Sequence, residues 1–409
     1  MVVAKKHHEL YGELGSIVGS KYVSDDYAVL LSYTRDMSPI PPVKPQGVVV
    51  RPGSVEEVIE LVRLANQTRT PLIPMGGKAS VGGCPPGQPG RGILVDMRRM
   101  DKVLEIDEVN MTVTAQCGIM MGELVSKVNE RGWDVHTAAQ PHYVVTAGGQ
   151  LSGMPGAGYG TYTPSIGFNW HNLLGIKVVL PNGSIIDTGT GKGSISTYRG
   201  HTWARGMHGP DLTGMFLGDG GIFGIKVEAT YRMFRLPKFT KSGCRCWDTL
   251  DEAYQAYLEL GEIDPFLYMQ PYAIAQIYSP EMMSIAAPGA EPTWFFFWQC
   301  IGNSEEEVEL KAKTTDAILV KHGGRVAEPA LAAYAENFMV SDMRELGKLG
   351  AMGEQPFFDL IAPRRDLVEC YRWSQEYISN SLRERGFDPT KLTILATISP
   401  TGTGYGITT

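Results

Sequence analysis

Short apolar runs separated by amphipathic stretches fill the first half of the chain. The apolar residues 48–50 predict a buried strand, and apolar positions at helical spacing over residues 55–65 predict a helix behind it. Ser54 and Glu57 have the spacing of a capping box, which marks the start of that helix. A second apolar strand ends at Pro74. We therefore expect a strand, helix and strand unit of the open α/β kind, in which ligands bind at the carboxyl ends of the strands.

The same patterning predicts further strands and one more helix before residue 236. Strands are expected at residues 93–95 and 111–117 and in an alternating stretch that ends at Phe234, and a helix is expected over residues 120–131. Residues 176–180 and 184–186 should form a hairpin whose Asn182-Gly183 corner suits a primed turn. Residues 9–36 are interpreted as one amphipathic helix and a loop, followed by a proline-rich connector.

Helical periodicity dominates from about residue 240. Helices are expected over residues 250–262, 305–321 and 365–385, and strands over residues 294–301 and 392–398. This mixture predicts an α+β layer on an antiparallel sheet. We divide the chain into a helical segment with a connector (residues 1–46), a ligand-binding domain (residues 47–236) and a cap or substrate domain (residues 237–409).

The clearest chemical signal is the glycine stretch at residues 74–83, which reads PMGGKASVGG. Gly76 and Gly77 directly follow a strand, and such glycines let consecutive backbone N–H groups point into one concavity that binds phosphate. The stretch is not a Walker loop, because Ala79 follows Lys78, and it is not a dinucleotide fingerprint. It is either the phosphate cradle of another nucleotide fold or a glycine-rich surface turn.

Composition narrows the function classes. With 43% hydrophobic residues, 20% charged residues and a formal net charge of −7, the 409-residue chain should be globular without affinity for nucleic acid. Its 48 glycines concentrate between residues 76 and 224, which favours loops that closely approach a bound ligand. The six cysteines lack metal-site spacing, so we expect reduced thiols and no metal. No secretory signal or membrane-spanning run is seen, so the expected location is the cytoplasm.

Four motifs in order resemble the FAD-binding domain of the vanillyl-alcohol oxidase and p-cresol methylhydroxylase flavoproteins. They are the glycine loop, the Thr-x-Gly-Gly run at residues 146–149, the hairpin at residues 178–183 and the closing Gly-x-x-Gly-Ile run at residues 221–225. The resemblance covers roughly residues 20–236. The runs YTRD (33–36) and GPDLTGMF (209–216) make the chain most similar to the FAD-linked glycolate oxidase and D-lactate dehydrogenase branch. The resemblance implies an α+β fold, with a two-part FAD-binding domain of the p-cresol methylhydroxylase type and an α+β cap domain on an antiparallel sheet.

Carried over position by position, the resemblance assigns contacts to FAD. Residues 75–80 would hold the pyrophosphate, residues 146–152 would line the ribityl chain and ring edge, and residues 222–225 would bond the adenine half. The implied FAD-binding residues are Pro74, Met75, Gly76, Gly77, Lys78, Ala79, Ser80, Gly83, Pro141, Thr146, Gly148, Gly149, Ser152, Gly167, Gly221, Ile222, Gly224 and Ile225. Lys78 is either the cation for the pyrophosphate or a side chain that points to solvent. Because covalent members carry histidine where this chain has Ala79, FAD should be held noncovalently.

Two features of the family are absent. The 2-hydroxyacid branch carries a histidine pair near its C-terminus, whereas this chain has no histidine after His322, so we expect either a missing C-terminal segment or different chemistry. The phenol-oxidising branch places an acid beside the flavin, in a run that residues 162–169 echo without the aspartate. A phenol oxidase is therefore the weaker alternative.

Oxidation of a C–H bond at a flavin needs a base for the hydroxyl proton and a cation for a substrate carboxylate. The base candidates are His142, Tyr162 and His171, each with a structural role as the alternative. The cation candidates are Arg35, Arg364 and Arg365. The Arg364-Arg365 pair equally fits a solvated helix start.

The resemblance and these candidates together predict an FAD-dependent dehydrogenase. Its expected substrate is a small organic acid such as lactate or glycolate, which would be oxidised by hydride transfer to flavin N5 with electrons passed to a partner protein. One alternative is oxidation of a phenolic or aromatic alcohol. Another is a non-catalytic FAD subunit that relays electrons within a larger complex. Both a homo-oligomer and a hetero-oligomer stay open. No direct membrane span is expected.

Overall fold

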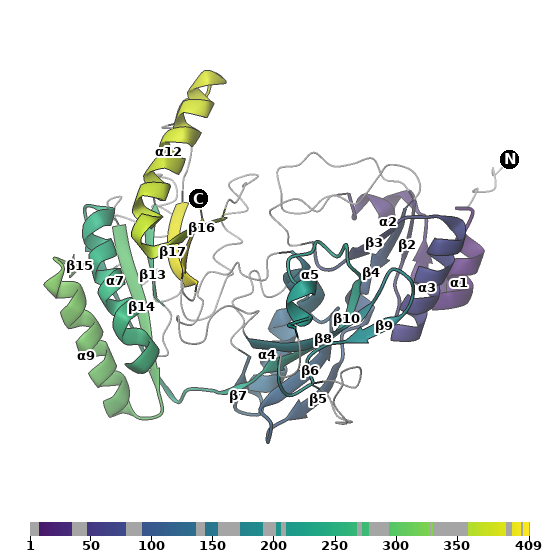
Figure 1. Ribbon diagram of the computed structural model, residues 1–409, viewed down its shortest axis with the longest axis horizontal. Helices are drawn as coiled ribbons and strands as arrows, with labels where there is room; N and C mark the ends of the chain where they lie inside the picture. Colours follow the sequence, from purple (N-terminus) through teal and green to yellow (C-terminus); the bar gives the residue numbers. More distant parts are fainter. Residues whose placement is uncertain are drawn as a thin grey trace. The chain divides into compact units, whose positions relative to one another are not determined.

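The computed structural model describes residues 8–34, 47–78, 92–135, 144–153, 172–190, 202–205, 210–267, 272–277, 294–327, 329, 359–389, 395–401 and 404–408. These residues form two compact units (Figure 1). The described residues up to Arg235 belong to the first unit, and those from Leu236 onward belong to the second. Each unit has its own sheets and its own apolar core.

The first unit contains a four-stranded sheet in the order β1-β2-β4-β3. Its strands are β1 (Val23–Ser24), β2 (Val48–Val50), β4 (Ile93–Asp96) and β3 (Leu72–Met75). The strand, helix and strand unit predicted from the sequence is confirmed, because β2 and β3 both run parallel to β4 and α3 (Val55–Thr68) connects them. The carboxyl ends of β3 and β4 therefore meet at one edge of the sheet, where Met75 pairs with Asp96.

Helix α3 begins as the capping box predicts. Ser54 Oγ accepts the Glu57 N–H at 3.2 Å, and the Glu57 carboxylate accepts the Gly53 N–H at 2.7 Å. The buried face of α3 includes Val58 and Leu61, which share an apolar core with α1 (Tyr11–Val18) and the sheet. Capping and periodicity thus agree, which explains why this helix was predictable.

The N-terminal segment differs from its prediction of one helix and a loop. Residues 8–34 form two helices, α1 and α2 (Tyr27–Leu31), with strand β1 between them. Asp26 caps the second helix, because its carboxylate accepts the Ala28 N–H at 2.9 Å. Strand β1 exists only through its antiparallel pairing with β2, which the local sequence does not show.

A second, antiparallel sheet of the first unit has the order β5-β6-β10-β8-β9. Its strands are β5 (Val103–Asp107), β6 (Thr112–Gln116), β10 (Ile225–Arg232), β8 (Leu173–Val179) and β9 (Ile185–Asp187). Helices α4 (Met121–Asn129) and α5 (Ala147–Ser152) share its apolar core, and β7 (Trp133–Asp134) pairs with β11 (Phe234–Arg235). The prediction missed β5, whose side chains are largely exposed.

The predicted hairpin between β8 and β9 is confirmed, but its turn is not of the primed type. The Gly183 N–H donates to the Leu180 carbonyl at 2.8 Å, and Gly183 alone has a positive φ in this turn, of 79°. Pro181 occupies the first corner position, and its ring fixes φ at about −65°, which excludes a primed turn.

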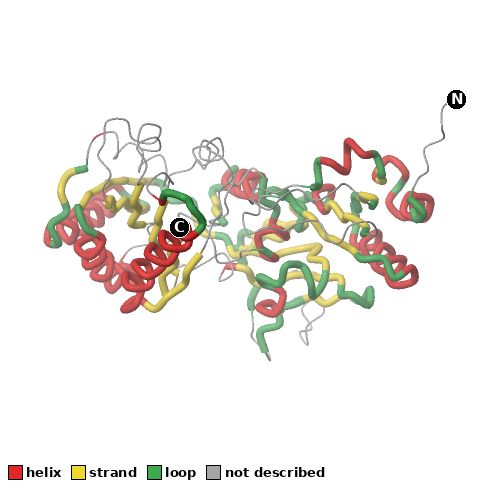
Figure 2. Tube along the Cα trace, turned by 90° about the horizontal axis from the view of Figure 1, so that it is seen from above, coloured by secondary structure: helices red, strands yellow, loops and turns green. Residues whose placement is uncertain are grey.

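The second unit is built on a seven-stranded antiparallel sheet in the order β15-β12-β14-β13-β17-β18-β16. Figures 1 and 2 show α7 (Leu250–Leu267) and α9 (Glu305–Lys321) side by side along one face of this sheet. Helix α12 (Leu367–Glu384) follows β16 (Asp359–Pro363). The predicted bounds of α9 are confirmed. The other strands are β12 (Phe239–Trp247), β13 (Tyr272–Ile277), β14 (Trp294–Gly302), β15 (Arg325–Val326), β17 (Leu395–Thr401) and β18 (Gly404–Thr408).

Short 3-10 turns complete the described elements. They are η1 (Ser20–Tyr22), η2 (Met97–Arg99), η3 (Thr213–Phe216) and η4 (Arg364–Asp366). Over the described ranges, no helix combines the length and the apolar composition that a bilayer crossing requires.

Candidate functional site

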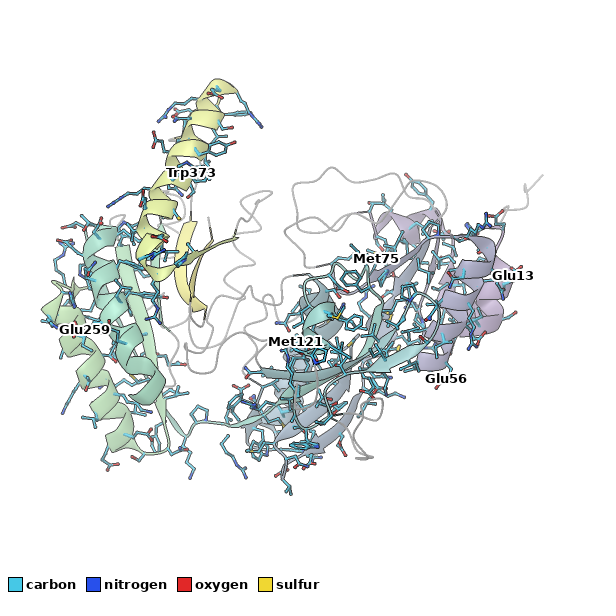
Figure 3. All side chains as sticks on the ribbon, in the orientation of Figure 1. Glu13, Glu56, Met75, Met121, Glu259 and Trp373 are labelled. Carbon is cyan, nitrogen blue, oxygen red and sulfur yellow. The ribbon has the colours of Figure 1, made fainter. Side chains whose placement is uncertain are left out.

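Three glycine-bearing segments of the first unit come together. They are residues 74–78 at the end of β3, the start of α5, and the turn at residues 218–224 before β10. Gly218 and Gly220 donate their N–H groups to the carbonyls of Leu151 and Ser152, both at 2.8 Å. Met75, which ends β3 and lies in the first segment, is labelled in Figure 3. The predicted FAD motifs are therefore neighbours in space, although about 140 residues separate the first from the last.

Gly76 and Gly77 have no room for a side chain. A Cβ on Gly76 would lie 2.2 Å from Thr146 Oγ1, and a Cβ on Gly77 would lie 1.3 Å from the Val144 carbonyl oxygen. The sequence predicted these glycines because phosphate needs close access to the backbone. The structure gives a second reason, because the end of β3 packs directly on the segment at residues 144–146 that leads into α5.

The first N–H groups of α5 already have partners in the protein. Ala147 donates to the Ile119 carbonyl at 3.0 Å, Gly148 to the Cys117 carbonyl at 2.8 Å, and Gly149 to Thr146 Oγ1 at 3.1 Å. Thr146 is thus the N-cap of α5 and is buried. These residues would shape a cofactor surface through their missing side chains rather than donate hydrogen bonds to it.

The turn at residues 218–224 is similarly self-contained. The Gly221 N–H donates to Asp219 Oδ1 at 2.9 Å, and the Ile222 N–H donates to the Asp219 carbonyl at 3.1 Å. Ile225 already belongs to β10, where it pairs with Val179. The Ile222 amide, which the resemblance assigned to the adenine half, is therefore engaged inside the turn, as is the Gly221 amide. The exposed side chains of Ile222 and Phe223 are apolar.

The Lys78 side chain is partly buried and its amine has a partner within the protein. Its amine donates to the Ser32 carbonyl and lies 4.9 Å from the centroid of the Tyr33 ring. Partial burial lowers the pKa of Lys78, and the nearby Arg98 charge lowers it further. Lys78 also has a φ of 60°, a conformation that costs free energy for a residue with a Cβ. We infer that its side chain ties the glycine loop to the N-terminal segment.

A buried polar network that the sequence did not reveal lies at the same strand ends. Tyr33 donates to Asp96 Oδ2 at 2.7 Å, and Arg98 makes two side-chain bonds to the Asp96 carboxylate at 2.9 and 2.7 Å. Burial raises the pKa of Tyr33 to about 12, with the Asp96 charge as a second cause. Burial raises the pKa of Asp96, but the Arg98 and Tyr33 hydrogen bonds outweigh it and hold that pKa below its usual range. The sequence signal that could have revealed this network is Asp96, an acidic residue directly after the apolar residues 93–95.

Several predicted site residues lie outside the described residues. They are the catalytic candidates Arg35, His142, Tyr162 and His171 and the cofactor candidates Ala79, Ser80, Gly83, Pro141 and Gly167. Arg364 is described and lies in η4 of the second unit, where its carbonyl accepts the Tyr254 hydroxyl at 2.7 Å. Arg365 is exposed and its guanidinium is 3.2 Å from the neighbouring Asp366 carboxylate.

The residues of the three segments fit FAD. Gly149 is exposed and has no side chain, so a flat group can approach the start of α5 closely, whereas a Cβ on Gly148 would face Cys117 at 3.1 Å. The apolar side chains of Val144, Ile222 and Phe223 are 39%, 78% and 54% exposed. Exposed apolar groups beside glycine backbone are the surface that an aromatic cofactor ring would cover.

Comparison with known proteins agrees with this geometry. A family described as FAD binding domain matches residues 46–189. The chain is 28% identical to glycolate oxidase subunit GlcD of Bacillus subtilis (strain 168) over 253 residues, covering 61% of this chain and 49% of that protein. It is 26% identical to a probable mitochondrial D-lactate dehydrogenase of Danio rerio over 314 residues, covering 76% of this chain and 59% of that protein. The chain thus spans about half of the first relative's length and about three fifths of the second's.

Among solved structures, the fold is similar to that of p-cresol methylhydroxylase with substrate bound. The TM-score is 0.75 at 19% sequence identity, over 98% of this chain and 82% of that chain. The α+β fold class expected from the sequence is confirmed. Residues 46–189 of the chain therefore match an FAD binding domain, the chain has the fold of p-cresol methylhydroxylase, and in sequence it is similar to glycolate oxidase and D-lactate dehydrogenase proteins.

Proposed function

We propose that the chain is an FAD-dependent dehydrogenase that oxidises a small 2-hydroxy acid, such as lactate or glycolate, and passes the electrons to a partner protein. The observation that carries this proposal is the junction of three glycine segments beside exposed apolar side chains in a domain of FAD-binding type. The relatives named as glycolate oxidase and D-lactate dehydrogenase support the substrate class. The Bacillus subtilis relative is named as a subunit, which supports a protein partner.

Bound FAD would supply the hydride acceptor for the substrate C–H bond. The backbone of residues 74–78 and the turn at residues 218–224 would hold its nucleotide half, noncovalently because Ala79 offers no attachment atom. A guanidinium binds a carboxylate in bidentate fashion, and Arg35 and Arg364 are the candidates for this role. His142, Tyr162 and His171 are the candidates for accepting the hydroxyl proton.

Anaerobic flavin bleaching tests the proposal. The purified protein should be yellow, acid precipitation should release the flavin, and lactate, glycolate or a longer 2-hydroxy acid should bleach it. Failure of all these acids would overturn the substrate assignment. Bleaching by a para-alkylphenol alone would select an aromatic substrate, and reduction only through a co-purifying protein would select an electron-relay subunit.

A further inference from the structure

A buried ion pair lies beside the turn at residues 218–224. The Lys226 amine is 2.6 Å from Asp219 Oδ1, and the two side chains are 2% and 1% exposed. Lys177 and Glu228 form another ion pair in the same region of the sheet, but their side chains are 25% and 13% exposed. The Asp219 and Lys226 charges are therefore far more completely removed from water.

Stability alone does not explain such a pair. Desolvation of two charges costs as much as their attraction returns unless further hydrogen bonds complete both groups. Here Asp219 Oδ2 is buried and has no hydrogen-bond partner among the residues that the structure describes. Burial lowers the pKa of Lys226, and the Asp219 charge offsets this only in part. The pair is therefore costly to bury, and its contacts indicate a structural role.

Its geometry connects four elements at the candidate FAD site. Lys226 is anchored in β10, where it pairs with Val178 of β8. Asp219 Oδ1 accepts both the Lys226 amine and the Gly221 N–H. A Cβ on Gly221 would lie 3.2 Å from Pro74 Cγ, so this glycine faces the end of β3. The hydrogen bonds from the turn to α5 complete the connection.

We propose that Asp219 and Lys226 are positioning residues for FAD. Lys226 fixes the Asp219 carboxylate, which fixes the Gly221 N–H and so holds the turn in one conformation. The turn contains three glycines with positive φ: Gly218 at 65°, Gly220 at 61° and Gly221 at 78°. Glycine populates negative φ about as readily, so these residues alone do not hold the turn in one conformation. A side-chain contact is therefore needed to hold the turn at residues 218–224 in the conformation that binds the adenine half of FAD. The inference rests on the proposed binding of FAD by this turn.

Dissociation constants of the deflavinated full chain for FAD, and for ADP as the adenine-containing part, test this role. Lys226→Met should weaken FAD and ADP binding by the same factor, about tenfold or more. Because this variant leaves Asp219 buried without its cation, the double variant Asp219→Asn/Lys226→Met is compared with it. The double variant should regain the thermal stability of the FAD-free protein, since no lone charge remains, while its FAD affinity stays low.

Lys177→Met is the matched control, because it removes the more exposed ion pair and should leave FAD affinity within about twofold of the wild type. A double variant that binds FAD as tightly as the wild type would overturn the positioning role of Asp219 and Lys226 but not the proposed function. Unchanged ADP affinity in Lys226→Met would overturn a role at the adenine half. A wild-type chain that takes up no FAD would instead overturn the proposed function, and this inference with it.

Discussion

The two units of the chain bury different kinds of side chain. In the first unit, charged groups are buried at strand ends: Asp96 is 1% exposed beneath Tyr33 and Arg98, and Asp219 and Lys226 form a pair shielded from water. Each of these charges sits next to a glycine segment of the candidate FAD site. Burial of these charges costs free energy, and their pairing holds the polar groups of the first unit in fixed positions.

The core of the second unit is dominated by aromatic side chains. The Phe296 ring centroid lies 6.2 Å from that of Trp247 and 5.8 Å from that of Tyr257, and all three residues are almost fully buried. Ion pairs of this unit include Lys241 with Glu309, which are 45% and 44% exposed. Aromatic packing is strongly favourable and tolerates small shifts, whereas a polar site does not. The buried ion pairs of the first unit, compared with the aromatic core of the second, fit a unit that positions a cofactor.

The largest expected effect comes from Gly77→Ala in the first unit. Its Cβ would overlap a backbone carbonyl oxygen, so the glycine loop must move. We expect a destabilisation of more than about 4 kcal/mol and loss of measurable FAD binding. Gly12→Ala is the control, because nothing lies within 4 Å of its Cβ. Denaturant unfolding and FAD titration measure both effects, and tight FAD binding by Gly77→Ala would contradict the packing described above.

Phe296→Ala should have the next largest effect. It empties a fully buried ring position in the aromatic core, which typically costs about 3–5 kcal/mol. The measurement is the free energy of unfolding of the second unit, followed by hydrogen exchange in β12 and β14. A loss below about 1 kcal/mol would show that this core is less tightly packed than the ring contacts indicate.

Tyr33→Phe should change how the free energy of unfolding depends on pH, because it removes the hydroxyl from the buried network of Tyr33, Asp96 and Arg98. The pKa of Tyr33 is raised to about 12 in the folded protein, above its ordinary value of about 10. The stability that the neutral hydroxyl provides is therefore fully present below about pH 10 and is lost as the pH rises toward 12. The variant should lose about 1–2 kcal/mol at neutral pH and also lose this alkaline dependence.

Unfolding free energies from pH 7 to pH 12 would test the Tyr33 prediction. Tyr27→Phe is the matched control, because Tyr27 is 63% exposed and lies in the same N-terminal segment. An alkaline dependence equal in wild type and Tyr33→Phe would argue against the Tyr33 and Asp96 hydrogen bond.

The smallest effect is expected for Lys241→Ala in the second unit. Both members of its ion pair with Glu309 are well exposed, so the unfolding free energy should change by less than about 0.5 kcal/mol. Thermal unfolding at low and high salt provides the measurement. A larger loss would weaken the contrast with the buried pair of Asp219 and Lys226.

Long, regular patterns were predictable from the sequence. The predicted and observed bounds of α9 coincide, and α3 begins at its capping box. Short strands such as β1, β7 and β15 were missed, as was the nine-residue β12. A strand is stabilised by partners that lie far away in the chain, so the local sequence carries little of the signal.

The sequence by itself determined the glycine segments, the FAD-binding type of the domain and the mixed fold. Only the tertiary structure decided which polar groups have partners: the Lys78 amine meets the Ser32 carbonyl, and Asp219 meets Lys226. The Gly148 and Gly221 amides are likewise committed within the protein. The physical reason is that a hydrogen bond depends on the distance and direction between two atoms, whereas a sequence specifies only which atoms exist.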